Sequence, residues 1–239
     1  IRAHKKEGII KSLTGVWKEE HVFELEQSYS IYQFYHAKLK ECDAKIEEHL
    51  REKSGVDTFV EPQKKEKSNK NNLNFNGKEM LYELTGTDLA EIFGITETNA
   101  IEIISEVGLD MSKWPTVKHF TSWLNLAPNN KISGGKVLSS RIPKKKNHAG
   151  QIFRMAAFAI QRSKNWLAMF YNRIKAKNGA PKAIVATARK IAAIFYKMIK
   201  ERVKFNPIPI EKYMDGFKEN QTRKLKRQAK NLGLQIVEM

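Results

Sequence analysis

The sequence predicts an all-α protein, and three observations support this. Apolar residues recur at spacings of three and four along most of the chain, which is typical of amphipathic helices. No run alternates polar and apolar residues convincingly enough to predict a strand. The 239 residues are 41% hydrophobic and 10% aromatic, so the chain can bury a core in one large domain or two modest ones.

The first 52 residues are expected to form a long helical arm. Between residues 17 and 51, apolar and aromatic side chains recur with helical spacing, among them Leu25, Tyr32, Tyr35 and Leu39. Charged residues occupy the other faces. This pattern is typical of a coiled coil or helical hairpin with an irregular tyrosine seam, so we expect the arm to form a homo-oligomer, a dimer or a tetramer.

A linker is predicted over 53–78, because Lys, Asn, Ser, Gly and Pro dominate there. The compact helical domain is predicted over 79–204. Within it, residues 88–108 contain two short helical patterns joined at Gly94 and Thr96. They resemble a helix–hairpin–helix unit, whose turn can offer backbone N–H groups to a phosphate. Thr96 stands where such turns more often have glycine, so two packed helices with a glycine cap are an equal alternative.

The rest of the domain is expected to contain three further helices and then a basic tail, 205–239. The first carries an apolar stripe from Val117 to Leu124 between two prolines. The second is one helix with Ile152, Met155, Ala156, Ala159, Ile160, Ser163, Leu167, Phe170 and Ile174 on one face. The third runs over about 181–203, with proline in its first turn. Trp114, Trp123 and Trp166 are assigned to the core in preference to stacking on bases.

Positive charge is concentrated in one part of the chain. The formal net charge is +17, yet residues 111–200 hold 19 Lys and Arg and no Asp or Glu, so the remainder carries −2. So dense a charge repels itself unless a polyanion receives it, which favours nucleic acid over an anionic membrane. A basic surface that serves solubility is the alternative.

The sequence also excludes several other classes of protein. Residues 183–199 are apolar but contain Arg189, Lys190 and Lys197, so they do not form a membrane span. Cys42 is the one cysteine, which excludes an internal disulfide and predicts a cytosolic location. Asn130 and Val137 break a P-loop pattern. The histidines have no zinc spacing, and the acid-free window cannot hold magnesium by itself.

The stretch NNKISGGKVLSSRIPKKKNHAGQIFR (129–154) contains the candidate nucleophile, Ser133. A serine hydroxyl can attack a phosphodiester when it is exposed and cations neutralise the developing charge. The two following glycines allow a close approach, although Ser-Gly-Gly is also a common turn. Ser139 and Ser140 are rivals, expected to be loop or phosphate contacts. The nucleic-acid-binding candidates are Lys131, Lys136, Arg141, Lys144, Lys145, Lys146 and Arg154. Asn147 is expected to cap a helix that begins near Gly150.

Two long stretches and several short motifs occur in an order typical of one family. The stretches are SLTGVWKEEHVFELEQSYSIYQFYHAKLKECDAKIE (12–47) and VGLDMSKWPTVKHFTSWLNLAPNNKISGGKVLSS (107–140). The motifs are Asn147, Arg154, Ala156-Ala157 and ATARKIA (186–192), where Thr187, Arg189 and Lys190 have either a packing or a functional role. Together they resemble the insertion-sequence transposases of the 110/1111 group, from about residue 12 to 233.

The resemblance implies a transposase or site-specific recombinase guided by a structured bridge RNA and acting on DNA in the bacterial cytoplasm. It implies an N-terminal RuvC-like domain, whose Asp-Glu-Asp-Asp set binds Mg²⁺, and a C-terminal domain whose nucleophile corresponds to Ser133. The chain begins near the junction of the two, so we expect the metal-binding domain to be missing here, supplied by a neighbouring subunit, and this piece to be inactive alone. The alternatives are a non-catalytic DNA- or RNA-binding remnant and a related DNA invertase.

Overall fold

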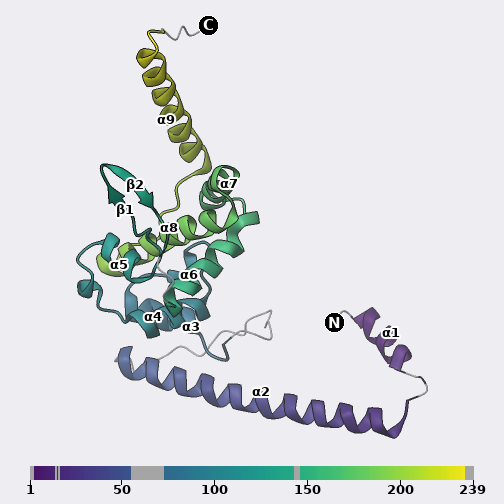
Figure 1. The fold of residues 1–239 in the computed structure, drawn as a ribbon. Coiled ribbons are helices and arrows are strands. Elements are labelled where there is room, and N and C mark those ends of the chain that lie inside the picture. Colours follow the sequence, from purple (N-terminus) through teal and green to yellow (C-terminus); the bar gives the residue numbers. More distant parts are fainter. Residues whose placement is uncertain (1–2, 14, 16, 55–72, 143–145, 235–239) are drawn as a thin grey trace.

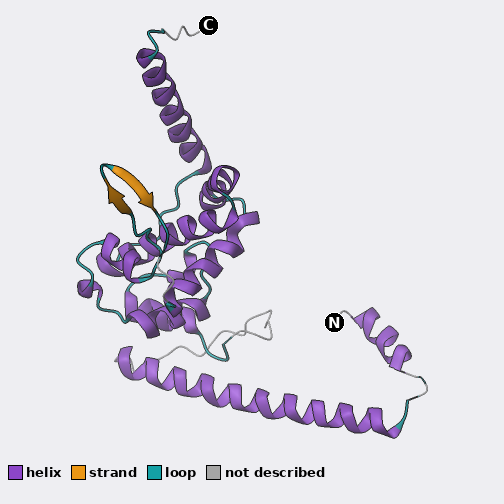
Figure 2. Ribbon diagram, viewed as in Figure 1, coloured by secondary structure: helices purple, strands orange, loops and turns teal. Residues whose placement is uncertain are grey.

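The computed structural model describes residues 3–13, 15, 17–54, 73–142 and 146–234. These residues fold into helices and one small hairpin (Figure 2), which confirms the predicted all-α class. In chain order the helices are α1 (Ala3–Leu13), α2 (Glu19–Ser54), α3 (Gly77–Thr85), α4 (Glu97–Val107), α5 (Val117–Trp123), α6 (His148–Ala159), α7 (Trp166–Asn178), α8 (Ala180–Glu201) and α9 (Ile210–Asn231). The hairpin strands, β1 (Lys131–Ser133) and β2 (Lys136–Ser139), lie between α5 and α6.

The long arm is helix α2, as predicted. It runs beside the helical domain and contacts it at its C-terminal end (Figure 1), where Leu50 packs with Phe75 and Met80. Near this contact the Asp43 carboxylate accepts hydrogen bonds from the backbone N–H and the side-chain amide of Asn74. The aromatic side chains farther along α2 remain exposed. Self-association through this arm stays a prediction.

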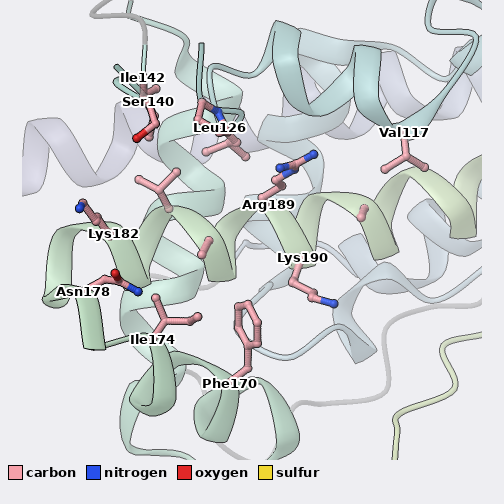
Figure 3. A pocket seen from close by; sticks show the side chains of 14 residues that line it. Val117, Leu126, Ser140, Ile142, Phe170, Ile174, Asn178, Lys182, Arg189 and Lys190 are labelled. Atoms are coloured by element: carbon pink, nitrogen blue, oxygen red, sulfur yellow. The ribbon is translucent and has the colours of Figure 1, made fainter. Parts of the chain in front are cut away.

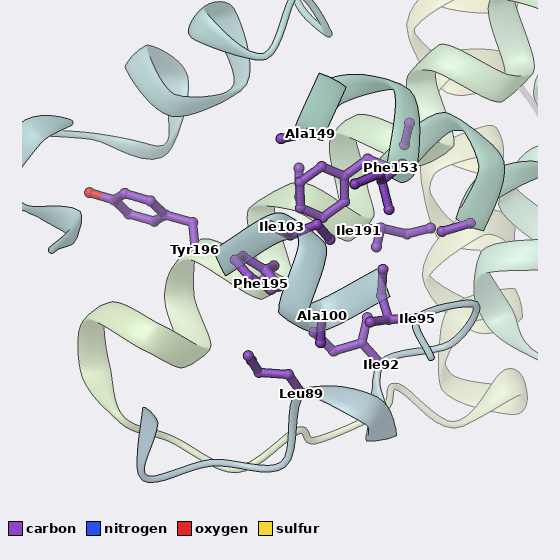
Figure 4. Close-up of a cluster of buried hydrophobic side chains, with 14 of the residues drawn as sticks. Leu89, Ile92, Ile95, Ala100, Ile103, Ala149, Phe153, Ile191, Phe195 and Tyr196 are labelled. Atoms are coloured by element: carbon purple, nitrogen blue, oxygen red, sulfur yellow. The ribbon is translucent and has the colours of Figure 1, made fainter. Parts of the chain in front are cut away.

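The core is built around α8, which packs against α5, α6 and α7. Aromatic rings from three helices meet there: the centroids of Phe120 and Phe153 lie 6.4 Å apart, and those of Phe153 and Phe195 lie 5.4 Å apart, both edge to face. Figure 4 shows Phe153 and Phe195 within this core. This is the favourable geometry for the aromatic quadrupole. The Tyr196 hydroxyl donates to the carbonyl of Trp114 at 2.6 Å. Helix α8 is therefore the central element of the core.

The predicted pair of helices in 88–108 is wrong in detail, because its first part is a single 3-10 turn, Leu89–Glu91. The second part is α4, whose N-terminus is capped by the Thr96 hydroxyl accepting from Asn99 N–H. Gly94 has φ +86°, and an added Cβ would lie 2.6 Å from the carbonyl oxygen of Ala156 and 2.7 Å from Ile160 Cγ2. The glycine thus allows the turn to pack directly on α6, which favours the packing interpretation over the phosphate contact.

The single helix expected to carry the face from Ile152 to Ile174 is also wrong. Helix α6 ends at Ala159, a 3-10 turn follows, and α7 begins after Asn165, whose side chain accepts from Ala168 N–H. Asparagine is more favourable at an N-cap than inside a helix. Its side-chain oxygen accepts a hydrogen bond from one of the first N–H groups of the helix, which have no partner within the helix. As a result Met155, expected to face inward, is 58% exposed, and Ser163 lies in the exposed break.

The predicted linker and tryptophan assignments hold in part. Most of the linker, 55–72, lies outside the described residues, but Phe75 is buried and α3 begins at Gly77, so its last residues belong to the domain. Trp114 and Trp166 are buried as predicted, whereas Trp123 is 41% exposed beside Trp114. The basic tail includes α9, which projects from the domain (Figure 1).

Replacing Gly94 with alanine tests the close approach of the turn to α6. We expect Gly94→Ala to lower the free energy of unfolding by about 2–4 kcal/mol, because the new Cβ is strained at positive φ and overlaps the α6 backbone. Gly216, in the middle of α9, is the control, since a Cβ there meets nothing within 4 Å. Gly216→Ala should leave stability unchanged or raise it by up to about 1 kcal/mol. Equal denaturation midpoints for the two variants would contradict the packing described here.

Candidate nucleic-acid interface and nucleophile

Ser133 ends β1, the first strand of a tight hairpin. The connecting residues, Gly134 and Gly135, have φ +55° and +73°. Two successive positive φ values define a type I′ turn, which matches the twist of a two-residue hairpin. The sequence analysis missed this hairpin, although two glycines between β-branched residues, Ile132 and Val137, are a recognised signal for it.

The hairpin has a polar face and an apolar face. Ser133 pairs with Lys136, and Ile132 pairs with Val137. Directly opposed residues share a face, with Cβ atoms about 5 Å apart, so Ser133 and Lys136 are neighbours on one side while the apolar pair lies on the other. Lys131 is opposite Ser139 across a small irregularity. Both glycines border open space, so the tip carrying the serine is fully accessible.

The base of the hairpin is fixed to the N-terminus of α6. Asn129 N–H donates to the Arg141 carbonyl at 3.0 Å, which closes the two ends of the hairpin. Asn147 caps α6 as predicted: its Oδ1 accepts from Gly150 N–H at 2.7 Å, while its Nδ2 donates to the Trp123 carbonyl at 3.1 Å. An added Cβ at Gly150 would overlap the carbonyl of Leu124. The chain leaving α5 therefore lies directly against α6 before it enters the hairpin.

Arg154 takes part in the same set of contacts between α6 and the chain that follows α5, which we call the α5–α6 lock. Its Nη2 donates at 2.8 Å to the carbonyl of Asn125, a residue with φ +55°. Burial lowers the pKa of Arg154, although an arginine remains charged at neutral pH. The sequence assigned Arg154 to the DNA backbone, whereas its position inside the lock favours a structural role.

The other predicted cations are at the surface. Lys131 and Lys136 are exposed on the hairpin, Arg141 is exposed at its base, and Lys146 is exposed beside α6. Lys144 and Lys145 lie outside the described residues. Of the two rival serines, Ser139 Oγ accepts a hydrogen bond from Arg141 N–H. Lys136 is the cross-strand neighbour of Ser133 and Lys131 lies on the same strand, so two exposed lysines flank the serine.

Ser140 lines a cavity of about 720 Å³ that runs along α8. We call it the α8 groove: its walls include Ser140 and Ile142 on one side and Ile174 and Asn178 on the other, and its floor includes Val185 and Arg189. Of the three α8 residues that matched family motifs, Thr187 is buried, while Arg189 and Lys190 line this groove.

The described residues contain no group of three or more His, Cys, Asp or Glu side chains that could hold a metal ion. A separate check of the helices in the described segments finds none that is long and apolar enough to cross a membrane.

The hairpin lies within a segment that matches the model of a known protein family. The model of the Transposase IS116/IS110/IS902 family matches residues 86–172, which include α4, α5, the hairpin and α6. No curated protein matches the chain. The matched segment thus carries the signature of a transposase, a class of protein that acts on DNA, and the match supports a transposase role.

The match over residues 86–172, which include Ser133, supports an IS110-family transposase. This confirms the family that the sequence resemblance predicted.

Alanine substitutions at two arginines of this region distinguish an arginine that stabilises the fold from one that is only exposed at the surface. We expect Arg154→Ala to lower the free energy of unfolding by about 1–3 kcal/mol, because it removes a charged donor from a partly buried carbonyl. Arg141→Ala removes an exposed side chain and should change stability by less than about 0.5 kcal/mol. Chemical denaturation of both variants measures the difference. A fully stable Arg154→Ala with weakened DNA binding would instead support the phosphate contact.

Proposed function

We propose that this protein is the serine-bearing part of a DNA transposase or site-specific recombinase, with Ser133 as the nucleophile. The observation that carries the proposal is the position of Ser133 on an exposed hairpin tip, opposite Lys136 and inside a family-matched segment. A nucleophile that must reach a phosphodiester in a DNA backbone needs such a protruding, open site. The hairpin base is fixed to α6, so the serine is presented by a rigid support.

The reaction would conserve the energy of the phosphodiester bond. The Ser133 oxygen attacks phosphorus, a new ester bond forms between serine and phosphate, and the bond from phosphorus to one sugar oxygen breaks. The serine proton is lost to a base and the released sugar oxygen gains a proton, so the products are a DNA–phosphoserine ester and a free sugar hydroxyl. Attack by another sugar hydroxyl reverses these steps and rejoins DNA without ATP.

The cations have two distinct tasks in this proposal. Lys136, across the hairpin from Ser133, and Lys131, farther along the same strand as Ser133, would stabilise the negative charge that develops on the phosphoryl oxygens. Arg141 and Lys146, with Lys144 and Lys145 outside the described residues, would bind neighbouring phosphates. No acidic residue occurs between positions 111 and 200 to oppose them.

The reaction also needs a general base, and in this proposal a Mg²⁺ site assists it. The carboxylates of a RuvC-like domain, in the same polypeptide or in a neighbouring subunit, fit that need. The exposed aromatic residues of α2, including Phe23, Tyr29 and Phe34, support a homo-oligomer in which subunits exchange such groups. A structured guide RNA is a further proposed partner, suited to the strong positive charge.

Alanine substitution of Ser133 and Ser139, the two serines in the hairpin strands, tests the nucleophile. In the complete gene product, with Mg²⁺, guide RNA and cognate DNA, Ser133→Ala should abolish strand exchange while nucleic-acid affinity stays within about twofold, because only the attacking oxygen is lost. Ser139→Ala is the matched control and should retain exchange, because Ser139 does not line the α8 groove. Gel analysis of recombinant products measures both.

Persistent strand exchange by Ser133→Ala would remove this residue from the mechanism. A wild-type protein that binds DNA under the same conditions without exchanging strands would favour a non-catalytic binding remnant. Exchange confined to fixed inverted sites would favour a DNA invertase.

A further inference from the structure

The α8 groove has an unusual distribution of charge. Its floor is one face of α8, where Lys182, Val185, Ala186, Arg189 and Lys190 follow each other at helical spacing. Three of these five are cations, and no acidic residue is among the described residues that line the groove. The long side chains of the cations and the small side chain of Ala186 leave an apolar floor bordered by positive charge.

The cations are spread along the groove. Figure 3 shows Lys182 and Lys190 well separated on α8, with Arg189 on the side of the helix that faces Leu126. The two lysines are eight positions apart, which is about 12 Å along the helix axis. Phe170 holds Lys190 in place, since the Lys190 ammonium lies 5.4 Å from its ring centroid. Positive charge is therefore available at successive points, as an extended polyanion requires.

The shape and apolar lining favour an unpaired strand over a duplex. A duplex presents phosphates on its outside and hides the faces of its bases, so it cannot fill an apolar cavity of about 720 Å³. An unpaired strand exposes both apolar base faces and phosphates, and proteins bind such strands in positively charged grooves with apolar contact surfaces.

The groove is continuous with the hairpin that carries the proposed nucleophile. Ser140 on its wall follows Lys136 by four residues, about 13 Å along an extended strand, and Lys136 is the cross-strand partner of Ser133. A DNA strand that presents a phosphodiester to the hairpin tip therefore has its adjoining nucleotides within reach of the groove. This continuity favours the DNA strand under attack over a separate RNA.

We propose that the α8 groove binds a single-stranded segment of the DNA adjoining the cleavage position, with its phosphates on Lys182, Arg189 and Lys190. The assignment rests on the proposed function, because it takes the hairpin tip as the place of strand attack. It gives Arg189 and Lys190 a binding role that is separate from the chemistry at Ser133.

Charge removal within and outside the groove tests the assignment. The double variant Lys182→Gln/Arg189→Gln, made in the full chain, is compared with Lys164→Gln/Lys177→Gln, which removes two exposed cations that do not line the groove. Fluorescence anisotropy is measured with a labelled single-stranded DNA, an RNA of the same sequence, and the DNA duplex. Ala186→Leu, which fills the floor without changing charge, is the second variant, and thermal melting followed by circular dichroism checks that every variant is folded.

We expect the groove variant to bind single-stranded DNA about tenfold more weakly, with the salt slope reduced by about 1.4 for two lost phosphate contacts. Duplex affinity should change by less than about twofold, as should all affinities of the control variant. Ala186→Leu should also weaken binding of the single strand. Tighter binding of RNA than of DNA, or equal losses in the groove and control variants, would overturn the assignment.

The result also separates the two proposals. Unchanged single-strand affinity in the groove variants, together with loss of strand exchange in Ser133→Ala, would reject the groove and leave the nucleophile in place. A chain that binds none of the three nucleic acids would reject both.

Discussion

The close approach of the chain after α5 to the N-terminus of α6 is the constraint on which the rest of the site depends. Gly150 leaves room for the Leu124 carbonyl, Asn147 joins the helix cap to Trp123, and Arg154 holds the Asn125 carbonyl. These contacts fix the chain immediately before the hairpin begins. A two-stranded hairpin is marginally stable by itself, so the direction in which Ser133 is presented is set by this lock and not by the strands.

Charge and packing are divided between separate parts of the protein. The aromatic core around α8 supplies the stability needed to keep 19 basic side chains within a 90-residue window. On the opposite faces of the same helix, residues such as Ile191 and Phe195 enter the core, while Lys182 and Arg189 face the groove. One helix thus holds the domain together and carries part of the proposed nucleic-acid interface.

The sequence predicted the class of fold and the long helices well, because helical periodicity is strong in α2 and α8. It failed where a short-range signal competed with that periodicity. The break at Asn165 interrupts an apolar stripe that continues in the next helix, and the Gly134-Gly135 hairpin is too short to show alternation. For the candidate site, composition and resemblance indicated Ser133 and the lysines near it, and their role stays a prediction. The contact between Arg154 and Asn125 could not be predicted, because a carbonyl 29 residues away leaves no mark in the local sequence.

The central claim is that an oxygen on the hairpin tip becomes covalently joined to DNA, and peptide mapping of a trapped protein–DNA adduct tests it most directly. The complete gene product is incubated with Mg²⁺, guide RNA and cognate DNA, the adduct is isolated under denaturing conditions, and the nucleotide-bearing peptide is identified by mass spectrometry. The account predicts a phosphodiester on Ser133. An adduct on Ser139, on Ser140 or on any other residue would contradict it.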